Sequence, residues 1–244
     1  MGLGGISPAR GEIGRAEVPA IFREGNALYE REDYSGAAAR YRKIVEGGWE
    51  SAPVYYNLGN AYFKQNRLGE AILNYRRAQN LAPRDPEVNK NLEYAREAVR
   101  DDITELPTGI WSRAGRTLAG WLSLEEWIGI TSAIYFLTFF WLLAVIVFRP
   151  LRKFSPAILK TLLPALVVSA ALAFLAYSHY RVPRGIILAE AVAIRYGPLE
   201  TDAAAFNLHM GTEVRVVRER NGWYQIALPD GTSGWLPSDS LGMI

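Results

Sequence analysis

The spacing of apolar residues divides this chain of 244 residues into three parts. In roughly the first hundred residues, apolar positions recur with the period of an amphipathic helix. The middle contains two long runs without a charged residue, and the last sixty or so residues alternate between apolar and polar, as short strands do. The pattern predicts a multidomain protein with an all-α part, two transmembrane α-helices and an all-β part.

The two uncharged runs cover residues 127–148 and 161–180. A helix rises about 1.5 Å per residue, so runs of this length reach about 30 Å, the thickness of a hydrocarbon core. Neither run has the polar stripe of a helix packed on a soluble core. Ser123 and Glu126 have the spacing of a capping box, and Ser155 before Pro156 suits the start of the second helix. We interpret both runs as transmembrane helices.

Residues 149–160 connect these runs with four cations and no anion. The cations are Arg149, Arg152, Lys153 and Lys160. The positive-inside rule makes this a basic cytoplasmic loop and places both flanking domains in the periplasm. Residues 1–8 lack the cationic start and apolar run of an export signal. The sequence leaves open whether a signal precedes residue 1, whether the first domain follows the span across unaided, or whether the orientation is inverted.

Residues 102–126 form a predicted linker before the first span. Apolar residues recur there at helical spacing, while Arg113 and Arg116 fall on another face. The apolar positions are Ile110, Trp111, Ala114, Leu118, Trp121 and Leu122. This pattern fits a helix on the membrane surface and an ordinary linker helix equally well.

Residues 18–101 contain an internal repeat, after a flexible N-terminus over residues 1–17. Seven pairs of like residues align at one constant shift: Ile21 with Tyr55, Gly25 with Gly59, Leu28 with Tyr62, Tyr34 with Leu68, Ala37 with Ala71, Tyr41 with Tyr75, and Ile44 with Ala78. A two-helix unit cannot bury its apolar face alone, so neighbouring units stack. We predict two helix pairs and a capping helix from Pro86 to about Arg100.

The second unit resembles the tetratricopeptide repeat, with Tyr in place of the leading Trp. The resemblance rests on Tyr55, Leu58, Gly59, Tyr62, Leu68, Ala71, Tyr75, Ala78 and Pro83. The first unit departs from the pattern at Ile21, Glu24 and Trp49. The resemblance implies a solenoid whose first helices form a concave face that binds an extended or helical peptide.

By repeat position, the candidate peptide-binding residues on this face are Asn26, Tyr29, Tyr56, Asn57, Asn60, Phe63, Lys90 and Asn91, with Phe22 and Tyr94 beside them. Asparagine offers both a donor and an acceptor to a peptide backbone. Lys90 alone is well placed to neutralise a ligand carboxylate, so we do not expect a carboxylate clamp. If Asn57 and Asn60 serve a ligand, replacing both with Ala should leave the domain folded; if they hold helices together, the domain should unfold.

Residues 186–241 alternate in short strands separated by turn signals. They resemble the bacterial SH3-like domain at residues 193–198, 211–216, 222–224, 230–231 and 234–236. The resemblance implies an extracytoplasmic barrel that binds cell-wall peptides or partner proteins. Its candidate groove residues are Tyr196, Trp223, Tyr224 and Trp235; Trp223 and Trp235 also suit the core.

Charge and composition narrow the function classes. Residues 109–185 hold 8 Lys and Arg against 2 Asp and Glu, whereas the parts before and after carry net charges of −1 and −3. These cations flank apolar runs, which indicates a membrane and not a nucleic acid. The chain has no Cys and only His179 and His209. We therefore expect no enzyme, no cofactor and no metal site, and the uncharged spans also argue against a transporter.

The order of the parts resembles the BatE-type proteins of bacterial aerotolerance (Bat) gene clusters. Those clusters also encode membrane proteins with von Willebrand A domains and a MoxR-type ATPase. The resemblance implies a non-enzymatic scaffold at the bacterial inner membrane that binds protein partners in an envelope complex. The alternative is a cell-wall accessory protein that binds peptidoglycan through its SH3-like domain.

Overall fold

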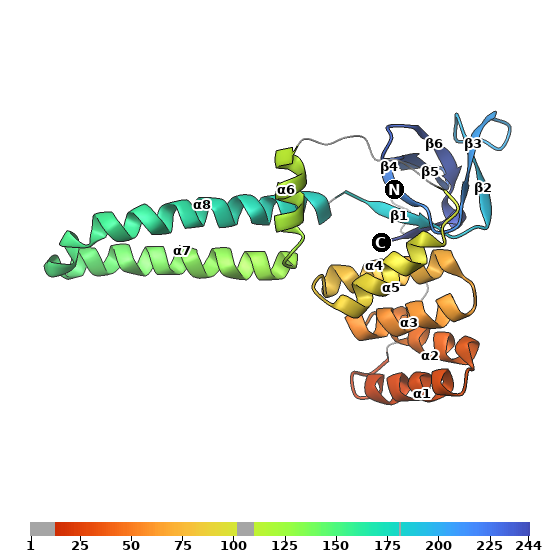
Figure 1. Ribbon diagram of the computed structural model, residues 1–244, viewed down its shortest axis with the longest axis horizontal. Helices are drawn as coiled ribbons and strands as arrows, with labels where there is room; N and C mark the ends of the chain where they lie inside the picture. The colour runs from red at the N-terminus through yellow and green to blue at the C-terminus, as the bar shows by residue number, and fades with distance from the viewer. Residues whose placement is uncertain (1–12, 102–109, 181) are drawn as a thin grey trace, which may run out of the picture. The chain divides into compact units, whose positions relative to one another are not determined.

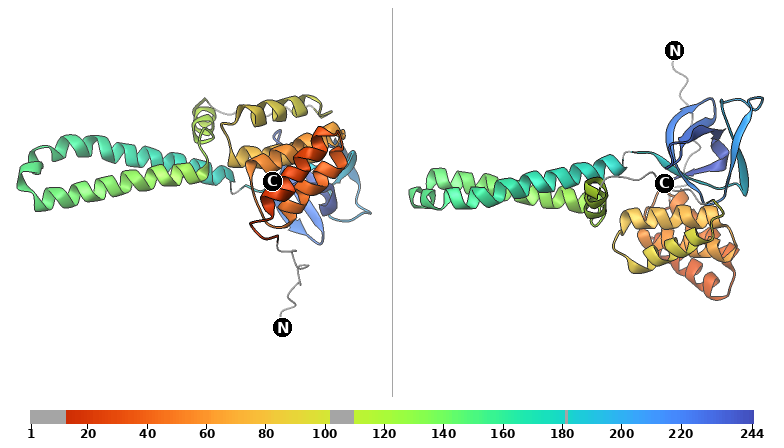
Figure 2. Two further views of the ribbon diagram at one scale, coloured as in Figure 1. Left: turned by 90° about the horizontal axis from the view of Figure 1, so that it is seen from below. Right: turned by 45° about the horizontal axis from the view of Figure 1, so that its top comes forward.

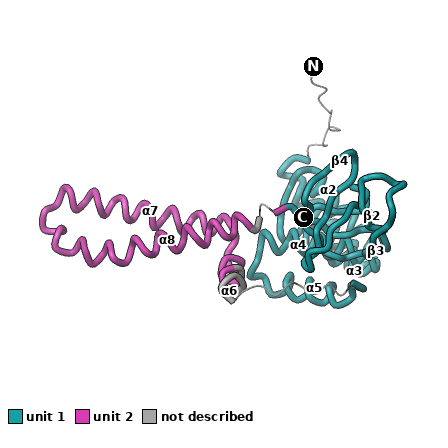
Figure 3. The backbone as a smooth tube through the Cα atoms, turned by 90° about the horizontal axis from the view of Figure 1, so that it is seen from above, with its two compact units in different colours: residues 1–105, 183–244 teal, residues 106–182 magenta. Residues whose placement is uncertain are grey.

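The computed structural model describes residues 13–101, 110–180 and 182–244, which form two compact units (Figures 1 and 3). Unit 1 combines Met1–Glu105 with Pro183–Ile244, and unit 2 is Leu106–Val182. Unit 2 is therefore an insertion in the chain of unit 1. The fold class agrees with the sequence: a helical N-terminal part, two long apolar helices and an antiparallel all-β part.

The N-terminal part of unit 1 is a stack of five helices in which each helix packs against the next (Figure 1). Their bounds are α1 Val18–Glu30, α2 Tyr34–Glu46, α3 Ala52–Lys64, α4 Leu68–Leu81 and α5 Pro86–Glu97. The Asp33 side chain caps α2 by accepting from the Gly36 amide, and Asp85 caps α5 by accepting from the amides of Glu87 and Val88.

The two helix pairs share one packing device. A Cβ atom at Gly25 would lie 2.6 Å from the Tyr41 ring, and one at Gly59 would lie 2.7 Å from the Tyr75 ring. Both rings are fully buried. The glycine in the first helix of each pair thus lets a tyrosine of the second helix lie directly on its backbone, and the second pair repeats the contact of the first.

The C-terminal part of unit 1 is a seven-stranded antiparallel sheet in the order β3-β2-β6-β5-β4-β1-β7. Its elements are β1 Arg184–Ile187, β2 Ala191–Arg195, β3 Ala204–His209, β4 Glu213–Arg220, β5 Trp223–Ala227, β6 Ser233–Pro237, the 3-10 helix η2 Ser238–Ser240, and β7 Leu241–Met243. Asn221 and Gly222 join β4 to β5 with φ values of 51° and 77°. Two positive φ angles fit the tight hairpin that the sequence signals there.

The sheet docks on α4 and the end of the helical stack, a contact that the sequence does not predict (Figure 2). Glycine makes close approach possible on both sides: a Cβ at Gly69 would lie 2.6 Å from the carbonyl oxygen of Ile187, and one at Gly242 would lie 2.6 Å from Leu73. Ile186 belongs to the same buried core as the helices. We call this contact between the helical stack and the sheet the docking interface.

Unit 2 is a hairpin of two long helices with a shorter helix across one end (Figures 1 and 2). Its elements are α6 Ile110–Ala119, α7 Leu124–Val147, the 3-10 helix η1 Arg149–Lys153 and α8 Ser155–Tyr180. The predicted capping box is present, since Ser123 and Glu126 exchange hydrogen bonds at the start of α7. By length and composition, both α7 and α8 could cross a membrane.

Candidate functional site

Asparagine and tyrosine side chains form a repeated ladder between the helices of the stack. The Oδ1 atom of Asn26 accepts from the Tyr41 hydroxyl at 2.7 Å and from Asn57 Nδ2 at 3.1 Å. One repeat later, Oδ1 of Asn60 accepts from the Tyr75 hydroxyl at 2.7 Å and from Asn91 Nδ2 at 2.9 Å. We call Asn26, Asn57, Asn60 and Asn91 the asparagine ladder.

Burial keeps the tyrosines of this ladder protonated. It raises the pKa of Tyr41 to about 12 and raises the pKa of Tyr75 further above its ordinary value. Each hydroxyl therefore donates to its asparagine over the whole physiological pH range. In each set the accepting asparagine lies on the first helix of a pair, the tyrosine on the second, and the donating asparagine on the helix that follows. Each set of hydrogen bonds therefore links three successive helices.

These hydrogen bonds indicate a structural role for asparagines that the sequence predicts to bind a ligand. Asn57 and Asn60 each hold a neighbouring helix, so their loss is expected to destabilise the stack, as the alternative interpretation of these residues requires. Ligand binding by the ladder itself stays a prediction.

Aromatic and charged side chains border the ladder. The rings of Phe63 and Tyr94 lie 5.6 Å apart, and Tyr94 is 63% exposed. The Tyr56 hydroxyl donates to Glu87 at 3.1 Å and accepts from Asn91 at 3.0 Å.

The remaining candidates on this face are Tyr29, which packs on Tyr34 at a centroid distance of 5.1 Å, and Lys90, which lies near Tyr94 on α5. The structure thus places Asn26 and Asn57 in one hydrogen-bonded group, and Asn60, Asn91 and Tyr56 in a second. Tyr94 and Lys90 remain available to a ligand, because both are exposed and their side chains make no hydrogen bond or ion pair among the described residues, whereas Phe63 is partly buried against the helical core.

The four candidate groove residues of the β-domain differ in exposure. Tyr196 is 74% exposed, Trp223 and Tyr224 are half-buried, and Trp235 is 5% exposed. The Arg218 guanidinium lies 5.1 Å from the centroid of the Trp235 ring. Trp235 therefore belongs mainly to the core, the second of the two roles that its sequence context allows, and Tyr196 is the side chain most open to a ligand.

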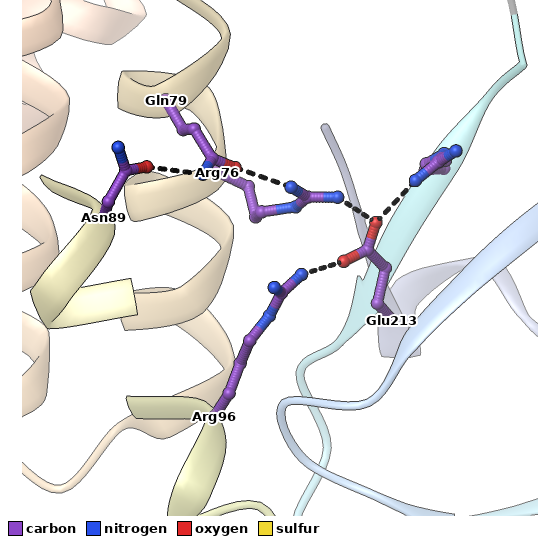
Figure 4. Close-up of polar contacts among 6 residues, drawn as sticks. Arg76, Gln79, Asn89, Arg96 and Glu213 are labelled. Atoms are coloured by element: carbon purple, nitrogen blue, oxygen red, sulfur yellow. Dashed lines mark hydrogen bonds and ion pairs between the residues drawn. The ribbon is translucent and has the colours of Figure 1, made fainter. Parts of the chain in front are cut away.

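A cluster of ion pairs stabilises the docking interface. The sequence does not predict it. Glu213 on β4 accepts from Arg76 at 2.5 Å, Arg96 at 2.6 Å and Arg184 at 3.2 Å (Figure 4). Arg76 also donates to Gln79, which donates to Asn89 on α5. Burial on its own raises the pKa of Glu213, but the three arginines outweigh it and lower that pKa to about 2.

A second polar cluster lies where the helical stack ends. Asp101 accepts from the amide of His209 at 2.7 Å and from the Thr212 hydroxyl at 2.6 Å, and it contacts Nδ1 of His209 at 2.6 Å. Burial raises the pKa of Asp101, but these hydrogen bonds more than compensate and lower it below its usual range. His209 therefore serves the docking interface. Among the described residues, no group of His, Asp and Glu could hold a metal ion.

One signal in the sequence points toward this interface. Gly69, Ile72 and Leu73 place small and apolar side chains on a part of α4 that faces the sheet. The repeat pattern accounts for Ala71 and Tyr75 but not for these three residues. The charged partners give no comparable signal, because isolated arginines and glutamates are ordinary on protein surfaces.

Two family models match parts of the chain. Residues 52–85, which contain α3 and α4, match the tetratricopeptide repeat. Residues 189–241, from before β2 to the start of β7, match the bacterial SH3 domain. No curated protein is similar enough to the chain to count as a match. The chain therefore carries a tetratricopeptide repeat and a bacterial SH3 domain, domain types that suggest protein interaction and, for the SH3 domain, cell-wall binding.

Proposed function

We propose that this chain is a non-enzymatic, membrane-anchored scaffold that binds a segment of a partner protein on the ladder side of its helical stack. The observation that carries the proposal is the exposed ring of Tyr94, which packs beside the partly buried Phe63, with the exposed Lys90 on the same helix as Tyr94. Aromatic side chains supply large contact areas at low entropic cost, and lysine adds attraction for an acidic segment. The docking interface uses α4 and Arg96 near the end of α5, and it leaves Tyr94 63% exposed.

The exposure of α7 and α8 supports membrane insertion. Only 6% of the apolar stretch of each helix is buried within the protein, whereas a core helix of a soluble protein is mostly buried. Large side chains such as Phe136, Leu137 and Phe140 are more than half exposed. Exposing such an apolar surface to water is strongly unfavourable, whereas the hydrocarbon core of a membrane accommodates it.

The docking interface supports the proposal that the chain of unit 2 crosses the membrane an even number of times. Arg76 and Glu213 come from chain segments on either side of unit 2, yet they share an ion pair. Both segments must therefore lie on one side of the membrane. The cations of residues 149–160 favour the cytoplasm for the connection between the spans, and this supports our proposal that unit 1 lies on the periplasmic side of a bacterial inner membrane.

The order of repeats, spans and SH3-like domain supports a more specific proposal for the partner. It resembles the BatE-type proteins, so the proposed partner is a membrane protein with a von Willebrand A domain, in a complex that includes a MoxR-type ATPase. Peptidoglycan binding through the SH3-like domain is the second candidate function. The exposure of Tyr196, which projects from a domain of the bacterial SH3 family, favours it.

Two matched variants separate these functions, because Tyr94 and Tyr196 are both exposed and both replaceable at little cost in stability. The full-length protein and the variants Tyr94→Ala and Tyr196→Ala are extracted in detergent. Co-purified proteins are identified, and retention on insoluble peptidoglycan is measured.

Loss of the von Willebrand A-domain partner in Tyr94→Ala alone supports the scaffold. Loss of peptidoglycan retention in Tyr196→Ala alone supports the wall-binding function. If neither variant loses a partner that the unmodified protein retains, both assigned surfaces are wrong.

A further inference from the structure

The short helix α6 is held at one end of the hairpin by two contacts within unit 2. The helix packs on α8, and near Gly115 the approach is close enough that an added Cβ would lie 3.5 Å from the Leu175 side chain. The indole Nε1 of Trp127 on α7 donates to the carbonyl oxygen of Ala119 at 2.9 Å, and both residues are buried. The helix runs across α7 and α8 and not along them (Figures 1 and 2).

The position of α6 along the hairpin corresponds to one membrane thickness. On α8 the relevant stretch runs from Ser155, where the helix begins, to Leu175; on α7 it runs from Trp127 to Val147, where the helix ends. The two stretches have the same length, and at about 1.5 Å per residue each spans about 30 Å, the thickness of a hydrocarbon core. The cations of η1 mark one membrane boundary, so α6 lies at the level of the other.

Two large apolar side chains at the end of α6 are uncovered. Leu118 is 55% exposed, and Trp121, in the turn between α6 and α7, is 67% exposed. Such exposure is costly in water, whereas tryptophan is favoured at the boundary between lipid headgroups and acyl chains. A helix that runs across the spans at this level has the direction of a membrane surface.

We propose that α6 is an interfacial helix that lies in the plane of the membrane and places Leu118 and Trp121 among the lipid headgroups and upper acyl chains. The proposal rests on the membrane insertion of α7 and α8 proposed above. Because α6 packs on α8 near Gly115 and is hydrogen-bonded to α7 at Ala119, its interfacial binding sets the depth of the hairpin and resists movement along the membrane normal.

Single spin labels test this placement in the full-length chain, which contains no native Cys to remove. Cysteine replaces Leu118, Trp121, Leu137 or Glu219, one at a time, and carries a nitroxide. Leu137 lies midway between Trp127 and Val147 and is exposed on α7, whereas Glu219 is exposed on β4. In vesicles of phosphatidylcholine and phosphatidylglycerol, collision rates with oxygen and with a water-soluble nickel chelate report the depth of each label.

The expected order of immersion is Leu137 deepest, then Leu118 and Trp121 at an intermediate depth, then Glu219 in water. If the labels at 118 and 121 meet the nickel chelate as often as the label at 219, α6 does not touch the membrane. If they meet neither reagent, protein covers them, and the lipid assignment is also wrong. The label at 137 distinguishes the two proposals: its exposure to nickel would overturn membrane insertion itself.

Discussion

Arg76 on α4 and Glu213 on β4 lie 137 residues apart in the chain, yet their side chains are 2.5 Å apart in the structure. All of unit 2 lies between them in sequence. This pair and the pair of Arg96 with Glu213 join the helical stack to the sheet, whereas Arg184 approaches Glu213 from the sheet itself. The tetratricopeptide repeat and the SH3 domain are therefore parts of one folded unit.

Removing the charge of Glu213 should weaken this unit. The Glu213→Gln change leaves three arginines close together without their shared carboxylate, and breaking a mostly buried ion pair typically costs about 3 kcal/mol. Chemical denaturation of the full-length protein in detergent, followed by near-ultraviolet circular dichroism, measures the loss. Glu219→Gln on the same strand is the control, because Glu219 is exposed and makes no ion pair among the described residues. Equal stability of the two variants would contradict the structural role of the cluster.

Stability should fall in acid through the same carboxylate. The pKa of Glu213 is about 2 in the folded protein, below its ordinary value of 4.5, so its contribution is complete above about pH 5 and is lost as the pH falls toward 2. Asp101 shifts in the same direction. The free energy of unfolding, measured at pH 7 and pH 3, should drop less in Glu213→Gln than in the unmodified protein. The same drop in both proteins would show that other groups cause the acid sensitivity.

Replacing Asn60 with Ala should destabilise the helical stack by about 1–3 kcal/mol. It removes two hydrogen bonds, from Tyr75 and Asn91, each of which contributes about 0.5–1.5 kcal/mol. Asn80→Ala is the matched control: Asn80 is exposed on α4, and alanine there should be neutral or slightly stabilising. Thermal unfolding of both variants checks the prediction. If the Asn60→Ala protein is as stable as the control, Asn60 does not hold the helices together, and the ligand-binding interpretation of the asparagine ladder is favoured.

Adding a side chain at Gly25 or Gly59, which lie against the buried rings of Tyr41 and Tyr75, should destabilise the helical stack. Gly59→Ala pushes a Cβ to within 2.7 Å of the buried Tyr75 ring, and overpacking of this kind costs typically about 1–3 kcal/mol. Gly47→Ala is the comparison, since Gly47 has an ordinary φ of −71° and its added Cβ would lie 2.9 Å from Cδ1, the far end of the Ile13 side chain, which can shift more easily than a buried ring. Denaturation midpoints should show a clear loss for Gly59→Ala and a small change for Gly47→Ala. A reversed order would exclude close packing at Gly59.

Labelling of introduced cysteines tests the proposed topology. Cysteine at Asn80 and at Glu219 should react alike with a membrane-impermeant maleimide on spheroplasts, because the docking interface requires both on one side. Cysteine at Arg152 in η1 should behave oppositely. With both soluble parts periplasmic, 80 and 219 react and 152 does not; the reverse pattern would invert the orientation. Different reactivity at 80 and 219 would mean that the chain crosses the membrane an odd number of times between them.

Much of the fold is predictable because its signals are local. The repeat of Gly25 and Tyr41 at Gly59 and Tyr75 identifies the helix pairs, since the same packing contact recurs at one period. Asn221 and Gly222 identify the β4–β5 turn, because few residues accept positive φ. Spacing also singles out the asparagines but not their partners: which atoms Asn26 and Asn60 bind depends on how adjacent helices pack.

The sequence by itself determined the kinds of parts and their order, because helical period, strand alternation and the length of an apolar run are properties of neighbouring residues. Only the tertiary structure decided that the first and last parts form one unit. Arg76, Asp101, His209 and Glu213 look like ordinary surface residues in the sequence, and their pairing spans more than a hundred residues. No local pattern encodes such a contact, since it arises from the fit of two folded surfaces at Gly69, Gly211 and Gly242.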